Sequence, residues 1–275
     1  MPTKTPEEIL ADASAWWDTS LIDIHPGKIA IRGYPIEDLI GRVRFPEMVW
    51  LMLRGELPSA GEADLLGTAL MAAVDHGPQA PSIAIARMAA TCGVGINNAM
   101  ASAINVLGDV HGGAGEQCVE LYRRIADRID AGAAMDTAVE AELAAGGRFV
   151  PGFGHRFHPI DPRAPRLLQV VDEAAAKGVV GGGFAAIGRA VEAALARRKG
   201  RRIPMNIDGA TAVIYAELGF PPPLCRGLFV LSRSVGAMAH AWEEMQSGER
   251  NKGPIPRRYL WRYRGQGERP VPAGD

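Results

Sequence analysis

The stretch LCRGLFVLSRSVGAMAHAWEEMQ, residues 224–246, is the longest uninterrupted helical pattern in the chain and decides the fold class. It is rich in alanine, glycine and serine, and such small side chains let a second helix pack closely against it. The run Pro221–Pro223 precedes it and prevents the previous helix from continuing. A chain built around such a segment is predicted to be all-α.

Helical periodicity extends outward from this segment over nearly all of the sequence after residue 32. A capping box at Ser59–Glu62 begins a helix that runs toward Val74. The strand signal is confined to Ser20–Arg32, a hairpin with its turn at His25–Gly27. Neither βαβ alternation nor an internal repeat is visible, so one short hairpin is expected beside the helices. Further helices are predicted over residues 99–107, 115–130, 137–145, 164–177, 184–199 and 210–218.

Length and charge exclude several classes of protein. The chain has 275 residues, 47% of them hydrophobic, enough for one large domain or a large domain with a smaller companion. Its 30 basic and 31 acidic side chains give a formal net charge of −1, so no overall field favours nucleic acid or an anionic membrane. No apolar run approaches the roughly 20 residues of a membrane span, and Met1–Trp17 lacks the features of a signal peptide. We expect a cytoplasmic protein that binds neither nucleic acid nor membrane.

The three cysteines, Cys92, Cys118 and Cys225, are odd in number and widely spaced. This pattern fits neither a disulfide framework nor a CxxC metal site. We therefore expect reduced, mostly buried thiols. No other ligand spacing indicates a metal site.

Three short clusters each place a titratable side chain before a helical run. They are His111-Gly112-Gly113, Gly152-Phe153-Gly154-His155 and Asn206-Ile207-Asp208. Glycine lets the backbone approach a ligand closely. Two histidines and one aspartate suit a reaction that needs a base and two hydrogen-bond donors around a carbonyl. The Gly-Phe-Gly run is not a dinucleotide fingerprint, because the third glycine is absent and no strand precedes it.

Each candidate residue also has a purely structural interpretation. His111 is expected beside the free N–H groups of the following helix start, where it either caps the helix or binds an oxyanion, and Asp208 is expected at an N-cap. Arg163 either binds an anion or follows a proline-led helix start, whereas Arg233 lies on an apolar helix and needs an anionic partner. His76 ends a helix, where a cation is favoured. The other histidines are interpreted as structural (His25, His240) or as near the site (His158).

Taken in order, these segments resemble the citrate synthase family over nearly the whole chain. The segment IRGYPIEDL, residues 31–39, is similar to the N-terminal signature of the family, and a similar segment follows at Leu51–Pro58. An ordered set of such matches is highly specific. The active-site blocks of the family are similar to Val110–Ala114, Gly152–Arg156, Asp161–Arg163, Asn206–Asp208 and Leu231–Arg233.

The resemblance implies a role for each matching residue. Asp208 would be the base, His111 the donor to the enol oxygen, and His155 the donor to the 2-oxoacid carbonyl. Arg269, in Glu268-Arg269-Pro270, would reach the site of a partner subunit in a homodimer. The substrate ligands would be His76, Arg163, Arg233 and Arg269. Coenzyme A would contact Gly152, Phe153, Gly154, Arg156 and Asn206.

The resemblance also implies an architecture and a set of substrates. Residues 1–150 would form the first part of a large helical domain, 151–220 a small CoA-side helical domain, and 221–275 the return helix and tail of the large domain. The tail from Arg257 to Asp275 is basic and aromatic, then proline-rich, and is expected to lie over a neighbouring surface. The substrates would be an acyl-CoA thioester and a 2-oxo dicarboxylate, with no permanently bound cofactor.

The chain departs from the usual family pattern in three ways. It is shorter, mostly between Leu70 and His111 and in the second domain, and Gly115 stands where Asn is usual. Asp75–Pro78 looks more like citryl-CoA lyases and the citrate-synthase-like part of ATP-citrate lyase. We therefore expect cleavage of citryl-CoA to acetyl-CoA and oxaloacetate. Citrate or 2-methylcitrate synthesis is the first alternative, and a non-catalytic CoA- or carboxylate-binding regulator is the second.

Overall fold

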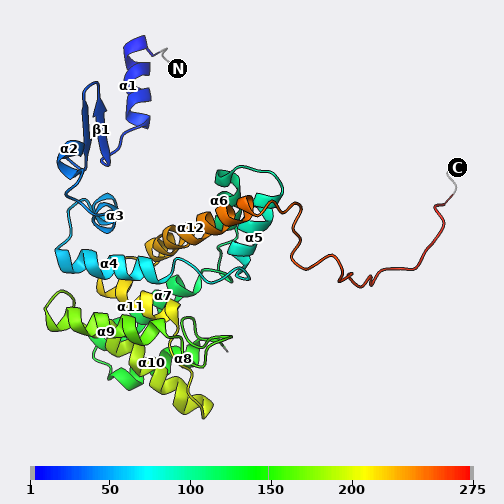
Figure 1. The fold of residues 1–275 in the computed structure, drawn as a ribbon. Coiled ribbons are helices and arrows are strands. Elements are labelled where there is room, and N and C mark those ends of the chain that lie inside the picture. Colours follow the sequence, from blue (N-terminus) through cyan, green and yellow to red (C-terminus); the bar gives the residue numbers. More distant parts are fainter. Residues whose placement is uncertain (1–3, 148, 273–275) are drawn as a thin grey trace. The chain divides into compact units, whose positions relative to one another are not determined.

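The computed structural model describes residues 4–147 and 149–272, and this part of the chain is mostly helical, as predicted (Figure 1). Among its helices, none is long and apolar enough to cross a membrane. The strands are β1 (Ile22–His25), β2 (Lys28–Ile31) and β3 (Tyr34–Pro35). The helices are α1 (Pro6–Trp16), α2 (Ile36–Leu39), α3 (Phe45–Arg54), α4 (Ala60–Ala72), α5 (Pro81–Thr91), α6 (Ile96–Asn105), α7 (Ala114–Asp130), α8 (Met135–Ala145), α9 (Arg163–Ala176), α10 (Gly183–Lys199), α11 (Ile207–Glu217) and α12 (Pro222–Gln246).

The described residues fall into two compact units, each with its own hydrophobic core. The first unit consists of residues 4–73 and 112–232, and the second of residues 74–111 and 233–272. Helix α12 therefore contributes its first part to one unit and its last part to the other. The division into a large domain, a small CoA-side domain and a return segment stays a prediction.

The N-terminal sheet contains one strand more than the hairpin predicted. Strands β1 and β2 pair antiparallel, with His25 opposite Lys28 across a two-residue turn whose Gly27 has φ 78°. Strand β3 extends the sheet by pairing Tyr34 with Ile31. A two-residue strand is too short to produce an alternating pattern, which explains why the sequence pattern does not predict β3.

Helix α1 is also absent from the sequence-based prediction. Thr5 caps it, Glu8 completes a capping box, and Pro6 occupies its first turn. None of its residues is buried, and Trp16 and Trp17 are 83% and 82% exposed. Because no face of α1 packs on a core, its sequence lacks a clear apolar stripe, and only the cap marks the helix.

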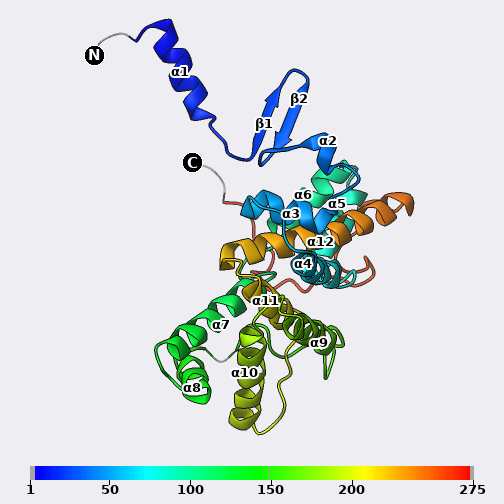
Figure 2. The ribbon, with the colours of Figure 1, turned by 90° about the vertical axis from the view of Figure 1, so that its left-hand side faces the viewer.

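Helix α11 is the centre of the first unit. It packs against α4, α7, α9 and α10, and nearly all of its residues are buried. Figure 2 shows α7, α9 and α10 gathered around it. Small residues such as Gly209, Ala210 and Ala212 allow the surrounding helices to come close. The beginning of α11, which carries Asn206–Asp208, is thereby held in a rigid frame.

The second unit has a small, alanine-rich core. Helix α5 packs against α6, and Ala237 and Ala241 of α12 join Ile83 in the same cluster. Small side chains bring backbones close together here. A Cβ atom on Gly236 would collide with the carbonyl oxygen of Val74. The turn that follows Val74 is therefore held directly against α12.

Candidate active site

His111 lies in the second unit, and its ring is bound at the start of α5 rather than at the start of the helix that follows it. The backbone N–H of Ser82 donates to Nε2 over 3.1 Å, and the Ser82 hydroxyl lies 3.0 Å from the same nitrogen. Because Nε2 accepts the amide bond, the proton of the neutral ring is on Nδ1. Burial, and then the charge of Arg233, lowers the pKa of His111. His111 is thus a neutral donor through Nδ1–H.

Arg233 belongs to the same group of residues in the second unit. It is buried, and its guanidinium lies 3.4 Å from the Ser82 hydroxyl. Ser82 therefore links two residues that the sequence motifs identify separately. Sequence analysis missed Ser82: Pro81-Ser82 signals a helix start, but nothing local indicates that this start meets a histidine.

His76 is exposed, in a turn of the second unit. The neighbouring Asp75 accepts the N–H of Gly77 at Oδ2 over 3.2 Å, and its Oδ1 lies 3.2 Å from Nε2 of His240. Burial alone would raise the pKa of Asp75, but hydrogen bonds from Gly77 and His240 lower it below its usual value. The ionised carboxylate of Asp75 therefore fixes the backbone on both sides of His76, through its contacts with Gly77 and His240.

Asp208 stands at the beginning of α11 in the first unit. The N-cap is Asn206, whose Oδ1 accepts the N–H groups of Asp208 over 2.9 Å and Gly209 over 3.2 Å. The expectation that Asp208 is the N-cap is therefore wrong, because it lies in the first turn of the helix. Its half-buried carboxylate lies at the positive end of the helix dipole, and Asn206 rather than Asp208 caps the helix.

The Gly152–His155 loop runs antiparallel to the segment before α11. The N–H of Gly154 donates to the Pro204 carbonyl over 2.7 Å, and the N–H of Asn206 donates to the Gly152 carbonyl over 2.9 Å. The side chain of Asn206 also donates to the Gly154 carbonyl over 2.7 Å. Asn206 thus joins the loop to the helix, and its contact with coenzyme A stays a prediction.

The first glycine of this loop is required by packing. Gly152 has φ 81°, and a Cβ atom there would lie 2.7 Å from both Cys118 Sγ and Gly209 Cα. The next residue, Phe153, packs edge-on against Tyr122, with 6.5 Å between ring centroids. The Gly-Phe-Gly motif therefore has a structural role, whatever ligand it contacts.

His155 follows the loop and is half-buried. Its Nδ1 accepts the backbone N–H groups of Phe157 and His158, each over 3.1 Å. The proton of the neutral ring is therefore on Nε2. Burial lowers the pKa of His155, against the opposing charge of Asp161. Like His111, this residue is a neutral donor.

Arg163 is the first residue of α9, and its guanidinium forms an ion pair with the buried carboxylate of Asp161. Its Nε lies 2.9 Å from one carboxylate oxygen of Asp161, and one terminal nitrogen lies 2.9 Å from the other oxygen. The two contacts form a bidentate pair. Asp161 also accepts the N–H of Ile207 over 3.0 Å. Burial would raise the pKa of Asp161, but its bonds with Arg163 and Ile207 lower it. Asp161 thus ties the start of α9 to the start of α11, and carboxylate binding by Arg163 stays a prediction.

The remaining predicted residues are exposed. Arg156 lies on the surface after the loop, and Arg269 lies in the tail beyond α12, where it contacts Gln266. No helix or strand forms over residues 247–272, and residues 273–275 of the predicted tail lie outside the described part. The reach of Arg269 into a partner subunit stays a prediction.

Comparison with known proteins agrees with the sequence motifs. The citrate synthase C-terminal domain family matches residues 11–66 and 59–264. The chain belongs to the citrate synthase family. It is 31% identical to the citrate synthase of Haloferax volcanii over 199 residues, 71% of this chain and 50% of that protein. It spans about half the length of the curated citrate synthases that it matches.

Solved structures of the citrate synthase family have the same fold. Citryl-CoA lyase from Hydrogenobacter thermophilus matches with a TM-score of 0.82 and 30% identity, over 93% of this chain and 97% of that chain. Citrate synthase from Thermoplasma acidophilum, in ternary complex with carboxymethyl coenzyme A and oxaloacetate, matches with a TM-score of 0.67 and 25% identity, over 83% of this chain and 59% of that chain.

Gly115 stands where the citrate synthase family pattern usually has Asn, and the surrounding structure gives no steric reason for a glycine at this position. Gly115 lies in the first turn of α7, and a Cβ atom there would meet no atom within 4 Å. A larger side chain would fit at this position.

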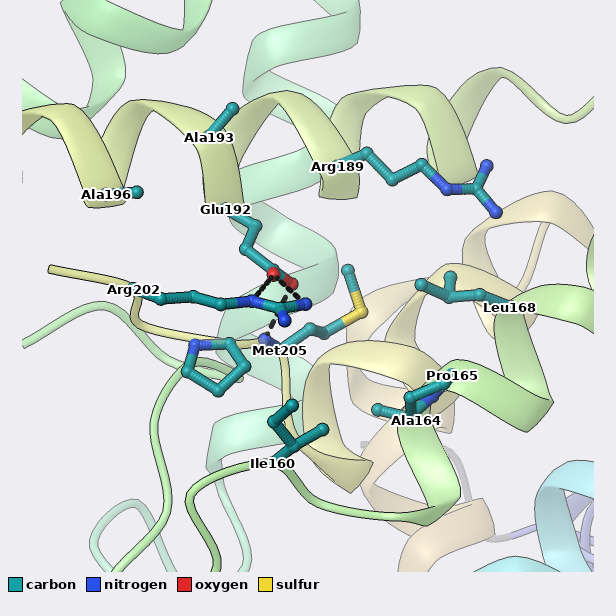
Figure 3. A pocket seen from close by; sticks show the side chains of 11 residues that line it. Ile160, Ala164, Pro165, Leu168, Arg189, Glu192, Ala193, Ala196, Arg202 and Met205 are labelled. Atoms are coloured by element: carbon teal, nitrogen blue, oxygen red, sulfur yellow. Dashed lines mark hydrogen bonds and ion pairs between the residues drawn. The ribbon is translucent and has the colours of Figure 1, made fainter.

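A cavity with a volume of about 490 Å³ lies in the first unit, between α9 and α10. Figure 3 shows Glu192 at its centre, bound to Arg202 and to the backbone N–H of Met205. The second arginine of its lining, Arg189, pairs with Asp172 over 2.6 Å. The positive charges of this cavity are therefore already neutralised.

A smaller cavity of about 260 Å³ lies beside the Gly-Phe-Gly loop. Phe153 contributes an aromatic wall, and Lys199 and Arg201 supply positive charge. This combination suits a ligand that has both a planar ring and phosphate groups.

Proposed function

We propose that this chain is a citryl-CoA lyase-type enzyme, which cleaves citryl-CoA to acetyl-CoA and oxaloacetate by acid/base aldol-type chemistry. The observation that carries the proposal is the stronger structural match to a lyase. The citryl-CoA lyase from Hydrogenobacter thermophilus matches with a TM-score of 0.82 and 30% identity, against 0.67 and 25% for the Thermoplasma citrate synthase. Gly115 and the Asp75–Pro78 segment support the same choice.

In the proposed reaction, the thioester end is handled by Asp208 and His111. As the carbon–carbon bond breaks, its electron pair becomes the enolate of acetyl-CoA, and the Nδ1–H of His111 donates to the enolate oxygen. Protonated Asp208 then gives its proton to the enolate carbon, which becomes the methyl group. The neutral state of His111 supports this role, because its proton position follows from the Ser82 bond.

The other end of the substrate is handled by His155 and the arginines. The citryl hydroxyl gives its proton to water as the carbonyl of oxaloacetate forms, and Nε2–H of His155 donates a hydrogen bond to that oxygen. A proton from water then restores protonated Asp208 for the next turnover. Arg163 and Arg233 would bind the carboxylates of the dianionic product, with His76 as a further ligand.

Coenzyme A is proposed to bind on the first unit, beside the Gly152–Gly154 loop. The smaller cavity supports this location, because Phe153 can face the adenine ring while Lys199 and Arg201 bind phosphates. The contacts proposed for Arg156 and Asn206 belong to the same surface. A homodimer, with Arg269 completing the site of its partner, is part of the proposal.

Citrate synthesis is the second candidate, favoured by the 31% identity to a citrate synthase. A synthase must also hydrolyse citryl-CoA, which requires a placed water. The test gives the purified protein citryl-CoA in one assay and acetyl-CoA with oxaloacetate in another, with free thiol and both acids measured. We expect citryl-CoA to yield oxaloacetate and acetyl-CoA faster than citrate and free CoA. Rapid thiol release with accumulating citrate would reverse the assignment.

A protein that binds CoA and oxaloacetate yet turns over neither mixture would be the non-catalytic regulator. The presence of Asp208, His111 and His155 together argues against that outcome. A metal-dependent hydrolase would lose its activity in EDTA, whereas the proposed chemistry would not.

A further inference from the structure

A continuous chain of charged and polar contacts in the second unit ends at the His76 turn. Arg87 on α5 lies 2.9 Å from Nδ1 of His240 on α12, and Nε2 of His240 lies 3.2 Å from Asp75. Asp75 accepts the N–H of Gly77. The contacts thus lead from α5 through α12 to the two residues that flank His76.

The proton positions in this chain of contacts follow from chemistry. A guanidinium has donors only, so Arg87 must donate and Nδ1 of His240 must accept. In the neutral ring the remaining proton is therefore on Nε2, which donates to the Asp75 carboxylate. His240 consequently has one arrangement that satisfies both neighbours at once.

Arg87 is itself held from a second side. Its guanidinium lies 2.6 Å from Glu243 and 2.5 Å from the fully buried Glu244. Glu244 also pairs with Lys252 over 2.5 Å. The Arg87 guanidinium, between the two glutamates and His240, cannot rotate away without leaving the buried charge of Glu244 without this partner.

The backbone supports the same arrangement. Gly236 lies one turn before His240 on α12, and only a residue without Cβ lets the Val74 carbonyl approach the helix there. The Val74–Gly77 turn is therefore pressed against α12 at one end and hydrogen-bonded to it through Asp75.

We propose that His240 is a positioning residue, which holds the Asp75–Gly77 turn and so presents His76 to the dicarboxylate substrate. The inference rests on the proposed function, in which His76 binds that substrate. It gives His240 a role in substrate affinity beyond the structural one expected from sequence. It also explains why a side chain with two hydrogen-bonding ring nitrogens stands at this place rather than an apolar one.

The test measures oxaloacetate and coenzyme A binding by calorimetry in a set of variants. His240→Leu removes both hydrogen bonds, and we expect the Kd for oxaloacetate to rise about tenfold, as for the loss of a bond to a charged group. His240→Gln can still accept from Arg87 and donate to Asp75, so its Kd should return to within about threefold of wild type. The Kd for coenzyme A should stay unchanged in both.

Two further variants separate positioning from general stability. Glu243→Gln removes a charge that lies 3.7 Å from Nδ1 of His240, but it keeps an acceptor for Arg87 and leaves the contact between His240 and Asp75 in place. It should therefore leave the oxaloacetate Kd unchanged. In a His76→Ala background, His240→Leu should cause no additional loss, because its effect passes through His76. If His240→Leu does not fold, His240→Asn replaces it, since its shorter side chain cannot span both neighbours.

Nitrogen-15 NMR of the imidazole rings gives a readout that needs no substrate. The His76 signals should change in His240→Leu and not in Glu243→Gln. If wild type binds oxaloacetate while His240→Leu alters neither the Kd nor the His76 signals, the inference is wrong and the proposed function stands. If wild type binds no oxaloacetate, the proposed function fails, and the His76 signals alone decide whether His240 positions the turn.

Discussion

His111 and His155 each accept a backbone N–H at one ring nitrogen. The donors are Ser82 for His111, and Phe157 and His158 for His155. An amide N–H cannot accept a hydrogen bond, so each ring keeps its proton on the opposite nitrogen. Both rings are then oriented donors without a positive charge, which suits stabilisation of a carbonyl or enolate oxygen.

This arrangement predicts the pH dependence of the rate. Burial lowers the pKa of His111 and of His155 below the usual 6.5, so both rings are neutral above their lowered values. We therefore expect no decline of kcat from these two rings as the pH falls through 6.5, and a decline only in more acid solution. The preference of the folded state for neutral rings is likewise fully present above pH 6.5 and is lost as the pH falls through the lowered values. An acid limb of kcat centred at or above 6.5 would contradict this assignment.

Asp208→Asn tests the residue that is proposed to protonate the enolate in cleavage and to act as the base in the reverse, condensation direction. The fold should persist because Asn206, not Asp208, caps α11. The rate should fall by at least about 100-fold, the lower end of a general acid–base contribution. Activity is measured with both substrate mixtures, and circular dichroism serves as the control for folding. A variant within a few-fold of wild type would show that Asp208 has only a structural role.

Among the structural elements, the paired Gly152–His155 loop and α11 act as one piece. The loop carries His155, the helix carries Asp208, and Asn206 bonds to both. Asp161 connects the start of α9 to this loop and helix, because its carboxylate accepts the N–H of Ile207 and pairs with Arg163. The relative positions of these side chains therefore depend on close backbone packing.

Gly152→Ala should disturb this packing, and Gly154→Ala is its matched control. Both glycines have positive φ, 81° and 83°, so both substitutions strain the backbone. Only at Gly152 would the new methyl group lie 2.7 Å from neighbouring atoms; at Gly154 the nearest atom is 3.6 Å away. We expect Gly152→Ala to lower the free energy of unfolding by about 1–3 kcal/mol more than its control, measured by urea denaturation. Equal losses would show that backbone strain alone sets the cost.

In the whole molecule, the residues with proposed roles are distributed over both units, and Arg269 is proposed to act from a second copy of the chain. Residues His111 and Arg233 belong to the second unit, while His155 and Asp208 belong to the first.

Subunit mixing tests the origin of Arg269. Heterodimers of Arg269→Ala and Asp208→Asn chains should regain partial activity, because one of the two hybrid sites carries both intact residues. The control mixes Arg163→Ala with Asp208→Asn, since Asp161 ties these two residues together within one chain. That mixture should stay inactive. No recovery with Arg269→Ala in verified heterodimers would mean that each site is built within one chain.

Caps, prolines and apolar periodicity act within a few residues, so the all-α class, most helix starts and the family could be predicted from the sequence. The Ser59–Glu62 capping box and Pro221–Pro223 are examples. Helix α1 and the two-residue strand β3 have no periodic apolar pattern and are not predicted. The sequence pattern assigns the helix cap to Asp208, whereas the structure shows that Asn206 is the N-cap. The contacts between the Ser82 amide and His111 and between His240 and Asp75 could not be predicted in this way. These bonds join distant segments and depend on how closely small residues let the helices approach.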